Sequence, residues 1–288
     1  MYLRALDRRD ILALVAMHRA IVGPAMSWSA AMLERQLWDP NHRHGRHVVV
    51  AVDDGTIAGV AGWVDVGREF FGSPVLARDD RAASLLVDEL IARARTAGAA
   101  WIRIGCADSE DHKRAVLVAR GFSVQLHFVT MACAAEPRDA APPAGLVRVP
   151  LATVAPEVLR EMHDASMLEI DNSGPMSLDD ARHLQARAWP DGSGVWFDGD
   201  RPTSFLITVR DCEPIDHALI DQVGVAPHWR RRGIARALLD HAIDVAGQAG
   251  ALEVRALIAS SNRASLALHA AAGLREISRR EMLQLNLV

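Results

Sequence analysis

The stretch Val225-Ala-Pro-His-Trp-Arg-Arg-Arg-Gly-Ile-Ala-Arg-Ala-Leu-Leu239 decides the fold of this chain. It joins a β-rich run, residues 217–225, to an amphipathic helix through a basic turn that contains Gly233. The first N–H groups of a helix have no partner inside it and carry partial positive charge, and a glycine lets a ligand approach the backbone closely. Three arginines add fixed positive charge beside the glycine: Arg230, Arg231 and Arg232. The pattern predicts a nest for a phosphate or pyrophosphate.

The spacing of this turn indicates which kind of phosphate site it is. No Gly-Lys-Ser/Thr follows, which excludes a Walker loop, and a single glycine excludes a dinucleotide fingerprint. The pattern Arg230-x-x-Gly233-x-Ala235 resembles the acyl-CoA pyrophosphate motif of the GNAT superfamily of N-acetyltransferases, Gln/Arg-x-x-Gly-x-Gly/Ala. An Arg-rich turn that only caps a helix would show the same residues, so the flanking sequence has to distinguish the two.

A second segment, Asn262-Arg-Ala-Ser-Leu-Ala-Leu-His-Ala-Ala-Ala-Gly-Leu274, strengthens the resemblance. It is similar to the next helix of the superfamily, Asn-x-x-Ala-x-x-Leu-Tyr-x-x-x-Gly-Phe, and Asn262, Leu268 and Gly273 match that pattern. Ser265, His269 and Leu274 replace the alanine, tyrosine and phenylalanine. Residues 252–258, between the two segments, are typical of a strand. The order of strand, phosphate turn, helix, strand and helix is the acetyltransferase order.

The chain also contains an internal repeat. Residues 134–145 are rich in proline and alanine and predict a linker. When the second half is shifted back onto the first, Pro227 falls on Pro74 and Ala235 on Ala82. The resemblance therefore implies an α/β (α+β) fold class: two tandem GNAT domains, each a central mixed, mostly antiparallel sheet flanked by helices. The predicted division is a first domain at 1–133, the linker at 134–145 and a second domain at 146–288.

The two copies differ where the phosphate would bind. The same alignment places Asp80 at Gly233 and Ala77 at Arg230, so Asp79 and Asp80 put two carboxylates into the anion nest. Like charges repel there by roughly 1 kcal/mol or more. We therefore expect the first domain to be degenerate and the acetyl-CoA site to lie in the second, although the first could still hold the cofactor through main-chain contacts.

Composition limits the function classes. The chain has 288 residues, half of them apolar, and a net charge of −4, which argues against nucleic acid as a partner. No apolar run is long enough to cross a membrane, and the N-terminus lacks a signal-peptide pattern. The three cysteines are scattered, which predicts a reducing cytoplasm and no metal site: Cys106, Cys133 and Cys212. A monomer or a homodimer fits equally well.

The resemblance implies roles for particular residues. The backbone of the strand before the turn would hold the pantetheine arm and the oxyanion, through Val223, Gly224 and Val225. The pyrophosphate would bind the three arginines and the start of the helix at Gly233, Ile234 and Ala235. Asn262 is expected to cap the next helix and to reach the cofactor region. The cofactor implied is acetyl-CoA, as a co-substrate, with no metal.

Two residues are candidates for proton transfer. Asp221 is the candidate general base, because a carboxylate in an apolar strand is costly to bury without a partner or a function; the alternative is a rim aspartate paired with an arginine. Strand alternation puts Gln222 on the opposite face. His269, in place of the tyrosine of the superfamily, is the candidate general acid for the thiolate; the alternative is a structural histidine.

The acceptor is expected to be a primary amine of a small molecule. Acidic residues in the region that binds the acceptor in the superfamily, Glu169 and Asp171, are candidates for holding a cation; the alternative is a solvated loop. A protein acetyltransferase acting on a lysine or an N-terminus, or a non-catalytic acyl-CoA-binding protein, would show the same cofactor motif. The sequence leaves these alternatives open.

Overall fold

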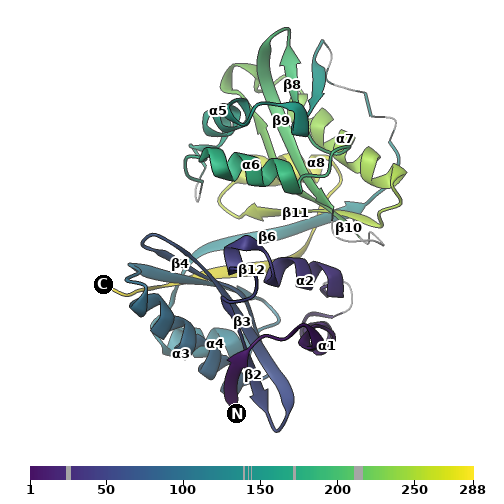
Figure 1. Ribbon diagram of the computed structural model, residues 1–288. Coiled ribbons are helices and arrows are strands. Elements are labelled where there is room, and N and C mark those ends of the chain that lie inside the picture. Colours follow the sequence, from purple (N-terminus) through teal and green to yellow (C-terminus); the bar gives the residue numbers. More distant parts are fainter. Residues whose placement is uncertain (24–26, 139, 142, 144, 171–172, 211–216) are drawn as a thin grey trace. The chain divides into compact units, whose positions relative to one another are not determined.

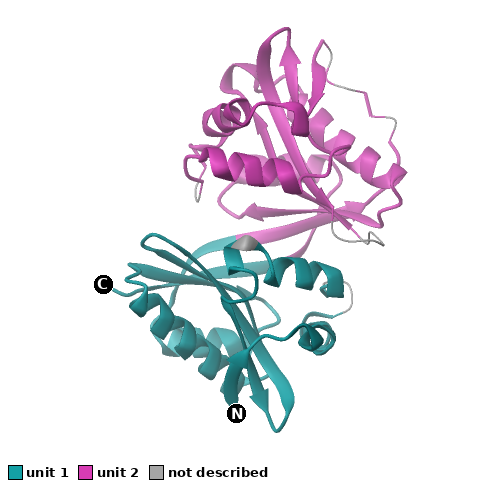
Figure 2. Cartoon of the chain, in the orientation of Figure 1, with its two compact units in different colours: residues 1–127, 279–288 teal, residues 128–278 magenta. Residues whose placement is uncertain are grey.

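The computed structural model describes the whole chain except residues 24–26, 139, 142, 144, 171–172 and 211–216. The chain divides into two compact units: unit 1 comprises residues 1–127 and 279–288, and unit 2 comprises residues 128–278 (Figure 2). Each unit is a mixed, mostly antiparallel sheet flanked by helices (Figure 1), which confirms the predicted fold class. None of the described helices is long and apolar enough to cross a membrane.

The sheet of unit 1 has the strand order β1-β2-β3-β4-β5-β12. The strands are β1 (Tyr2–Ala5), β2 (Val48–Asp53), β3 (Thr56–Val66), β4 (Glu69–Ala77), β5 (Trp101–Ala107) and, from residue 279 on, β12 (Arg275–Asn286). Its helices are α1 (Ile11–Val22), α2 (Ala30–Leu37), α3 (Asp80–Thr96) and α4 (Asp111–Ala119). Only β4 and β5 pair in parallel among the pairings described for this unit.

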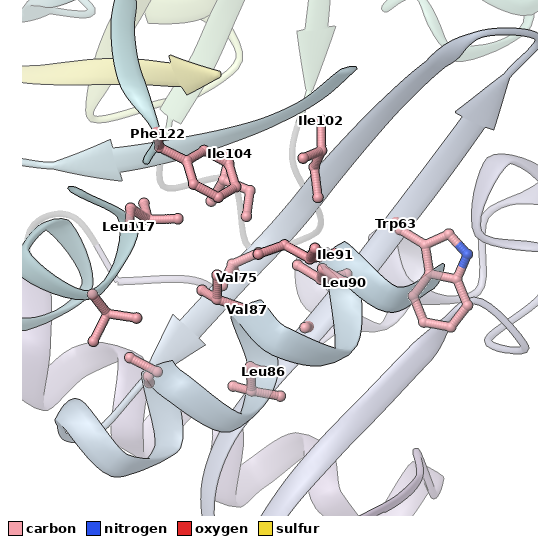
Figure 3. Close-up of a cluster of buried hydrophobic side chains, with 14 of the residues drawn as sticks. Trp63, Val75, Leu86, Val87, Leu90, Ile91, Ile102, Ile104, Leu117 and Phe122 are labelled. Carbon is pink, nitrogen blue, oxygen red and sulfur yellow. The ribbon is translucent and has the colours of Figure 1, made fainter. Parts of the chain in front are cut away.

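Helices cover both faces of the unit 1 sheet because successive residues of a strand point to opposite faces. Val49 and Ala51 of β2 belong to the core under α3 and α4, part of which Figure 3 shows. Val48, Val50 and Val52 belong to a second core, under α1 and α2. A run of apolar residues without polar alternation therefore marks a strand that is buried on both faces.

Unit 2 repeats this plan with the strand order β6-β11-β10-β9-β8-β7. Its strands are β6 (Ser123–Ala134, within unit 2 from residue 128), β7 (Val147–Pro150), β8 (Gly194–Asp198), β9 (Arg201–Arg210), β10 (His217–Val225) and β11 (Glu253–Ala259). Its helices are α5 (Pro156–Met167), α6 (Leu178–Arg187), α7 (Ile234–Gln248) and α8 (Arg263–Ala271). Leu206 of β9 packs in the α7 core, whereas Phe205 and Ile207 pack with α5 and α6.

Two strand segments lie in a different unit from the one that the sequence suggests. Residues 280–286 of β12 pair antiparallel with β5, and Leu283 is fully buried in the core of unit 1. Residues 128–134 of β6 pair antiparallel with β11 in unit 2. The sequence places these two segments in the second and the first domain, because a strand pattern does not reveal which edge a strand joins.

The described part of the predicted linker, 134–145, is bound to unit 2. The backbone N–H of Arg138 donates to Asp244 at 2.9 Å, and its guanidinium donates to Asp240 at 3.0 Å. A Cβ on Gly247 of α7 would come within 2.5 Å of the backbone at 136–137. Glycine at this position therefore allows the segment to pack directly on the helix.

The place of the C-terminal strand can be tested by truncating a core side chain. Leu283→Ala should lower the free energy of unfolding by about 2–5 kcal/mol, because it removes a fully buried side chain and leaves a cavity. Val288→Ala, at a residue that is 89% exposed, is the control and should change little. Urea denaturation of both variants measures the effect, and equal stability would contradict the assignment of β12 to the core of unit 1.

Candidate active site

The central feature of unit 2 is the separation of two parallel strands. β10 and β11 pair from His217–Glu253 up to Ile220–Ala256, although both strands continue beyond that pair. A β-bulge at Asp221 shifts the register of β10 against β9 at the same point. Bulges bend a strand and increase its twist. The edge of β10 from residue 221 on is therefore not paired with β11.

A cavity of about 760 Å³ opens at this separation. Its walls come from α5 and the residues after it, from β10, from the turn before α7, and from α7, β11 and α8. All of its described lining residues belong to unit 2. Most of the residues predicted to bind the cofactor line it: Val223, Gly224, Val225, Arg230, Arg231, Gly233, Ile234, Ala235 and Asn262.

The turn before α7 has the backbone that the sequence predicts for an anion site. Gly233 is the N-cap of α7 with a φ of 79°, in the left-handed region that favours glycine. No side chain caps the helix there, and a Cβ on Gly233 would meet nothing within 4 Å. The first N–H groups of α7 are thus left without a side-chain acceptor at the wall of the cavity.

The three arginines of the turn have different surroundings. Arg230 donates to the Glu169 carboxylate at 3.2 Å and to the Ser166 carbonyl at 3.3 Å. Arg231 has a left-handed φ of 66° and lines the cavity. Arg232 stacks over Trp229 at 4.6 Å and is not among the described lining residues.

Of the two carboxylates predicted to bind the acceptor, Glu169 belongs to the described residues and Asp171 does not. Glu169 lines the cavity and pairs with Arg230, although its side chain is 79% exposed. Asp171 lies outside the described residues, as does the acidic segment 211–216. The ion pair of Glu169 was not predicted, because the two partners lie 61 positions apart in the chain.

Gly224 and Asn262 have clear structural functions. A Cβ on Gly224 would lie 2.2 Å from the ring of Phe205, so glycine is needed here to admit that buried ring. Asn262 caps α8, and its side-chain oxygen accepts from the Ser265 N–H at 3.0 Å. The predicted capping is confirmed, and both residues also line the cavity.

Asp221, the predicted base, lies on the bulge and lines the cavity. Its Oδ1 accepts from the Arg187 guanidinium of α6 at 2.9 Å. This contact agrees with the alternative to the general-base role, an aspartate paired with an arginine. Gln222 was predicted to point to the opposite face of the strand, but it lines the same cavity as Asp221. The bulge interrupts the regular alternation of side chains along β10 at this point.

His269, the predicted acid, is 2% exposed and lines the cavity. Its Nδ1 lies 2.8 Å from the Ser265 carbonyl oxygen, which can only accept, so Nδ1 carries the proton of the neutral ring. Its buried Nε2 has no partner. Burial lowers the pKa of His269 below 6.5 and so favours the neutral form at pH 7. A proton on Nε2 would require the imidazolium, and this arrangement disfavours the acid role at neutral pH.

A further group of polar residues in the cavity wall was missed by the sequence analysis. His163 and Ser166 lie on the buried face of α5 with Leu159 and Met162. His163 Nδ1 bonds the Asp164 carboxylate at 3.0 Å. The helical spacing of these four positions predicts that they share one buried face of the helix, but it does not reveal that part of this face borders a cavity.

Comparison with known proteins agrees with this geometry. Residues 157–274 match the model of the acetyltransferase (GNAT) family, a span that includes the turn, the separated strands and most of the cavity wall. Unit 2 contains a GNAT acetyltransferase domain. A search of curated proteins found no significant match.

Solved structures share the fold of the whole chain. A GCN5-related N-acetyltransferase from Sphaerobacter thermophilus is 20% identical, with a TM-score of 0.78 over 99% of this chain and 95% of that chain. A tandem GNAT protein from the clavulanic acid biosynthesis pathway is 15% identical, with a TM-score of 0.73 over 99% of this chain and 98% of that one. At these identities the likeness establishes the tandem GNAT fold.

Unit 1 has the same strand separation, but its own side chains occupy the edge. β4 and β5 stop pairing after Gly72, and the next carbonyls of β4 accept bonds from α4. Lys113 Nζ donates to the Val75 carbonyl at 2.8 Å, and His112 Nε2 donates to the Ala77 carbonyl at 2.7 Å. Counted from the last parallel pair, these carbonyls correspond to Val223 and Val225 of the GNAT domain.

The turn before α3 also differs from its counterpart. It consists of two residues, Arg78 and Asp79, between the end of β4 and the start of α3. Asp79 is the N-cap, and its carboxylate accepts from the Ala82 N–H at 2.9 Å. The N-caps therefore align Asp79, rather than Asp80, with Gly233. The Asp79 carboxylate therefore accepts a hydrogen bond from the first turn of α3, whereas no side chain caps the first turn of α7 in the GNAT domain.

The protonation of His269 can be tested directly. We expect ¹⁵N–¹H spectra of the labelled protein to show the proton on Nδ1 at pH 7, because Nδ1 donates to a carbonyl. The titration midpoint should lie below 6.5, because burial disfavours the imidazolium. The assignment uses His269→Gln, which removes the signal. A proton on Nε2, or a midpoint above 6.5, would contradict this description.

Proposed function

We propose that unit 2 binds acetyl-CoA and transfers its acetyl group to the primary amine of a small molecule by direct attack on the thioester. The observation that carries the proposal is that one cavity contains both an uncapped helix N-terminus and an unpaired strand edge. The first is suited to a pyrophosphate and the second to an amide-bearing arm. Pantetheine contains two amides, and coenzyme A joins it to a pyrophosphate.

The residues present fit this co-substrate. The N–H groups at the start of α7, with Arg230 and Arg231, would hold the pyrophosphate. The strand edge at Val223 and Val225 would hold the pantetheine arm. The buried Nε2 of His269 is a hydrogen-bond acceptor without a partner, as expected where a ligand completes the wall. When bound, acetyl-CoA supplies an activated carbonyl carbon.

The chain's own groups would promote the transfer by electrostatics and position. Backbone N–H groups of β10 beyond the bulge are in place to stabilise negative charge on the carbonyl oxygen. Arg187 holds the Asp221 carboxylate at 2.9 Å, which orients a negative charge toward an incoming ammonium. Neutral His269 would accept a hydrogen bond rather than donate a proton.

Glu169 has a related role in this proposal. A phosphate that binds Arg230 competes with Glu169 for the same guanidinium. Because an exposed ion pair contributes only about 0–1 kcal/mol, the co-substrate can displace it. Displacement would leave the Glu169 carboxylate available to the cationic acceptor.

Unit 1 would contribute no second cofactor site. Its strand-edge carbonyls are occupied by Lys113 and His112, and the N-cap carboxylate of Asp79 occupies the helix terminus. Lys113 is 2% exposed and pairs with Glu110 at 2.7 Å, so removing it from the edge would leave a buried charge without its partner. We therefore expect one acetyl-CoA per chain.

Calorimetric titration with acetyl-CoA tests the proposal. We expect one site per chain in the unmodified protein, with affinity lowered about tenfold or more in Gly233→Asp, because a carboxylate would then face the pyrophosphate. A Cβ at this position would meet nothing within 4 Å, and aspartate tolerates a left-handed φ, so folding should be retained.

Gly199→Asp is the matched control. Gly199 also has a left-handed φ, 56°, and free space at its Cβ, but it lies in the β8–β9 turn and does not line the cavity. This variant should bind as the unmodified protein does. Two sites per chain would contradict the degeneracy of unit 1, and the absence of binding would overturn the proposed function.

A further inference from the structure

The cavity lacks an obvious free base among its described carboxylates. The two that line it, Asp221 and Glu169, each bond an arginine, at 2.9 Å and 3.2 Å. For Asp221 the ion pair engages Oδ1, so Arg187 competes with a substrate for this carboxylate. The histidines of the same wall are the remaining candidates for the proton acceptor.

His163 is a histidine of the cavity wall that the fold holds in a defined orientation. It lies on α5, is 7% exposed and lines the cavity. Its Nδ1 is 3.0 Å from the Asp164 Oδ1, and the same oxygen accepts from the Met176 N–H at 2.9 Å. Burial acts to raise the pKa of Asp164, but the bonds from Met176 and His163 together outweigh it and leave this pKa below its usual value, so the carboxylate is ionised at pH 7.

The location of the ring proton follows from this contact. An ionised carboxylate can only accept, so the proton of neutral His163 resides on Nδ1. The Nε2 lone pair is then directed away from Asp164 and is available to another group. This is the arrangement in which a carboxylate orients a histidine for proton abstraction.

Two neighbouring polar atoms of the wall also lack partners. Ser166 Oγ, one helical turn along α5 from His163, is buried without a hydrogen bond. Gln222 Oε1, on β10 just after the bulge, is buried without one as well. Buried polar atoms are rarely left unsatisfied, and these two point to a ligand with N–H or O–H groups.

We propose that His163 is the general base of the acetyl transfer, oriented by Asp164, and that Ser166 and Gln222 position the acceptor amine beside it. This inference rests on the proposed function. Nε2 takes one proton from the ammonium of the bound acceptor, and the nitrogen lone pair that this frees forms the bond to the carbonyl carbon. As the C–S bond breaks, the nitrogen gives its second proton to the leaving thiolate, so that the products are the N-acetylated amine and the coenzyme A thiol, and the proton on Nε2 is released to solvent.

The other charged or titratable groups of the cavity wall belong to neighbouring elements. They are Asp221 of β10, Glu169 after α5, Arg230 and Arg231 of the turn, Arg236 of α7 and His269 of α8. Arg236 bonds Asp240 at 2.7 Å and the Ala271 carbonyl. Among the described groups of the wall, His163 and His269 are the histidine rings, and only His163 is oriented by a carboxylate.

The test compares two nucleophiles in the full-length protein. A primary alkylamine is protonated at neutral pH and needs a base, whereas hydroxylamine is already unprotonated. In His163→Gln we expect kcat/KM for the alkylamine to fall about 100-fold or more, while turnover with hydroxylamine and the affinity for acetyl-CoA are retained. His183→Gln, an exposed histidine of α6 outside the cavity, is the control and should retain both activities.

A second measurement does not depend on turnover. At a pH at which the ring is neutral, ¹⁵N–¹H spectra of the free protein should show His163 with its proton on Nδ1 and an unprotonated Nε2, and Asp164→Asn should perturb this pattern. A proton on Nε2 would overturn the assignment.

The outcomes separate this inference from the proposed function. If His163→Gln keeps its activity toward the alkylamine, or loses both activities while still binding acetyl-CoA, His163 is not the base. If the unmodified protein binds no acetyl-CoA and acetylates neither nucleophile, the proposed function fails and this assignment fails with it.

Discussion

The unpaired backbone edge of β10 beyond Ile220 is the constraint on which the site of unit 2 depends. Parallel pairing with β11 ends there, and the bulge at Asp221 turns the strand away. Backbone groups without partners are costly to bury, so such an edge requires water, a side chain or a ligand. The cavity lies along this edge, and the uncapped start of α7 lies in the same wall. The backbone therefore leaves polar groups along this edge that need a partner from outside the sheet.

In unit 1 the corresponding backbone groups have side-chain partners. Its β4 and β5 also separate, but Lys113 and His112 of α4 donate to the exposed carbonyls, and Asp79 caps the following helix. The two units thus show two solutions to one problem in the same fold. Unit 2 bonds the Val225 carbonyl to Arg230 at 3.2 Å and gives the Val223 carbonyl no described side-chain partner, whereas unit 1 satisfies both corresponding carbonyls with side chains of α4.

The walls of the cavity combine carboxylates held in ion pairs with two oriented histidine rings. Its described carboxylates are held by arginines, whereas the rings of His163 and His269 are both fixed through Nδ1. Their partners differ: a carboxylate orients His163, and a backbone carbonyl orients His269. An ionised carboxylate stabilises the imidazolium that a base must form, and a carbonyl does so less. The same residue type is therefore suited to different tasks in one cavity.

The sequence by itself determined the features that depend on neighbouring residues. The left-handed Gly233, the uncapped helix that follows and the cap by Asn262 all follow from local backbone requirements. The tandem repeat and the GNAT resemblance follow from the order and spacing of such local features. They were sufficient to predict the basic turn and most of the proposed cofactor-binding residues that the structure places in the cavity wall.

Only the tertiary structure decided the features whose partners lie far apart in the chain. Arg187 pairs with Asp221 across 34 positions, and Arg230 with Glu169 across 61. The pairing of β12 with β5 joins residues even further apart. His163 reads in the sequence as one more residue on the buried face of a helix, and its cavity exists because two other strands separate beside it. Side-chain periodicity reports burial, but whether a buried position meets core or cavity depends on what the rest of the chain packs against it.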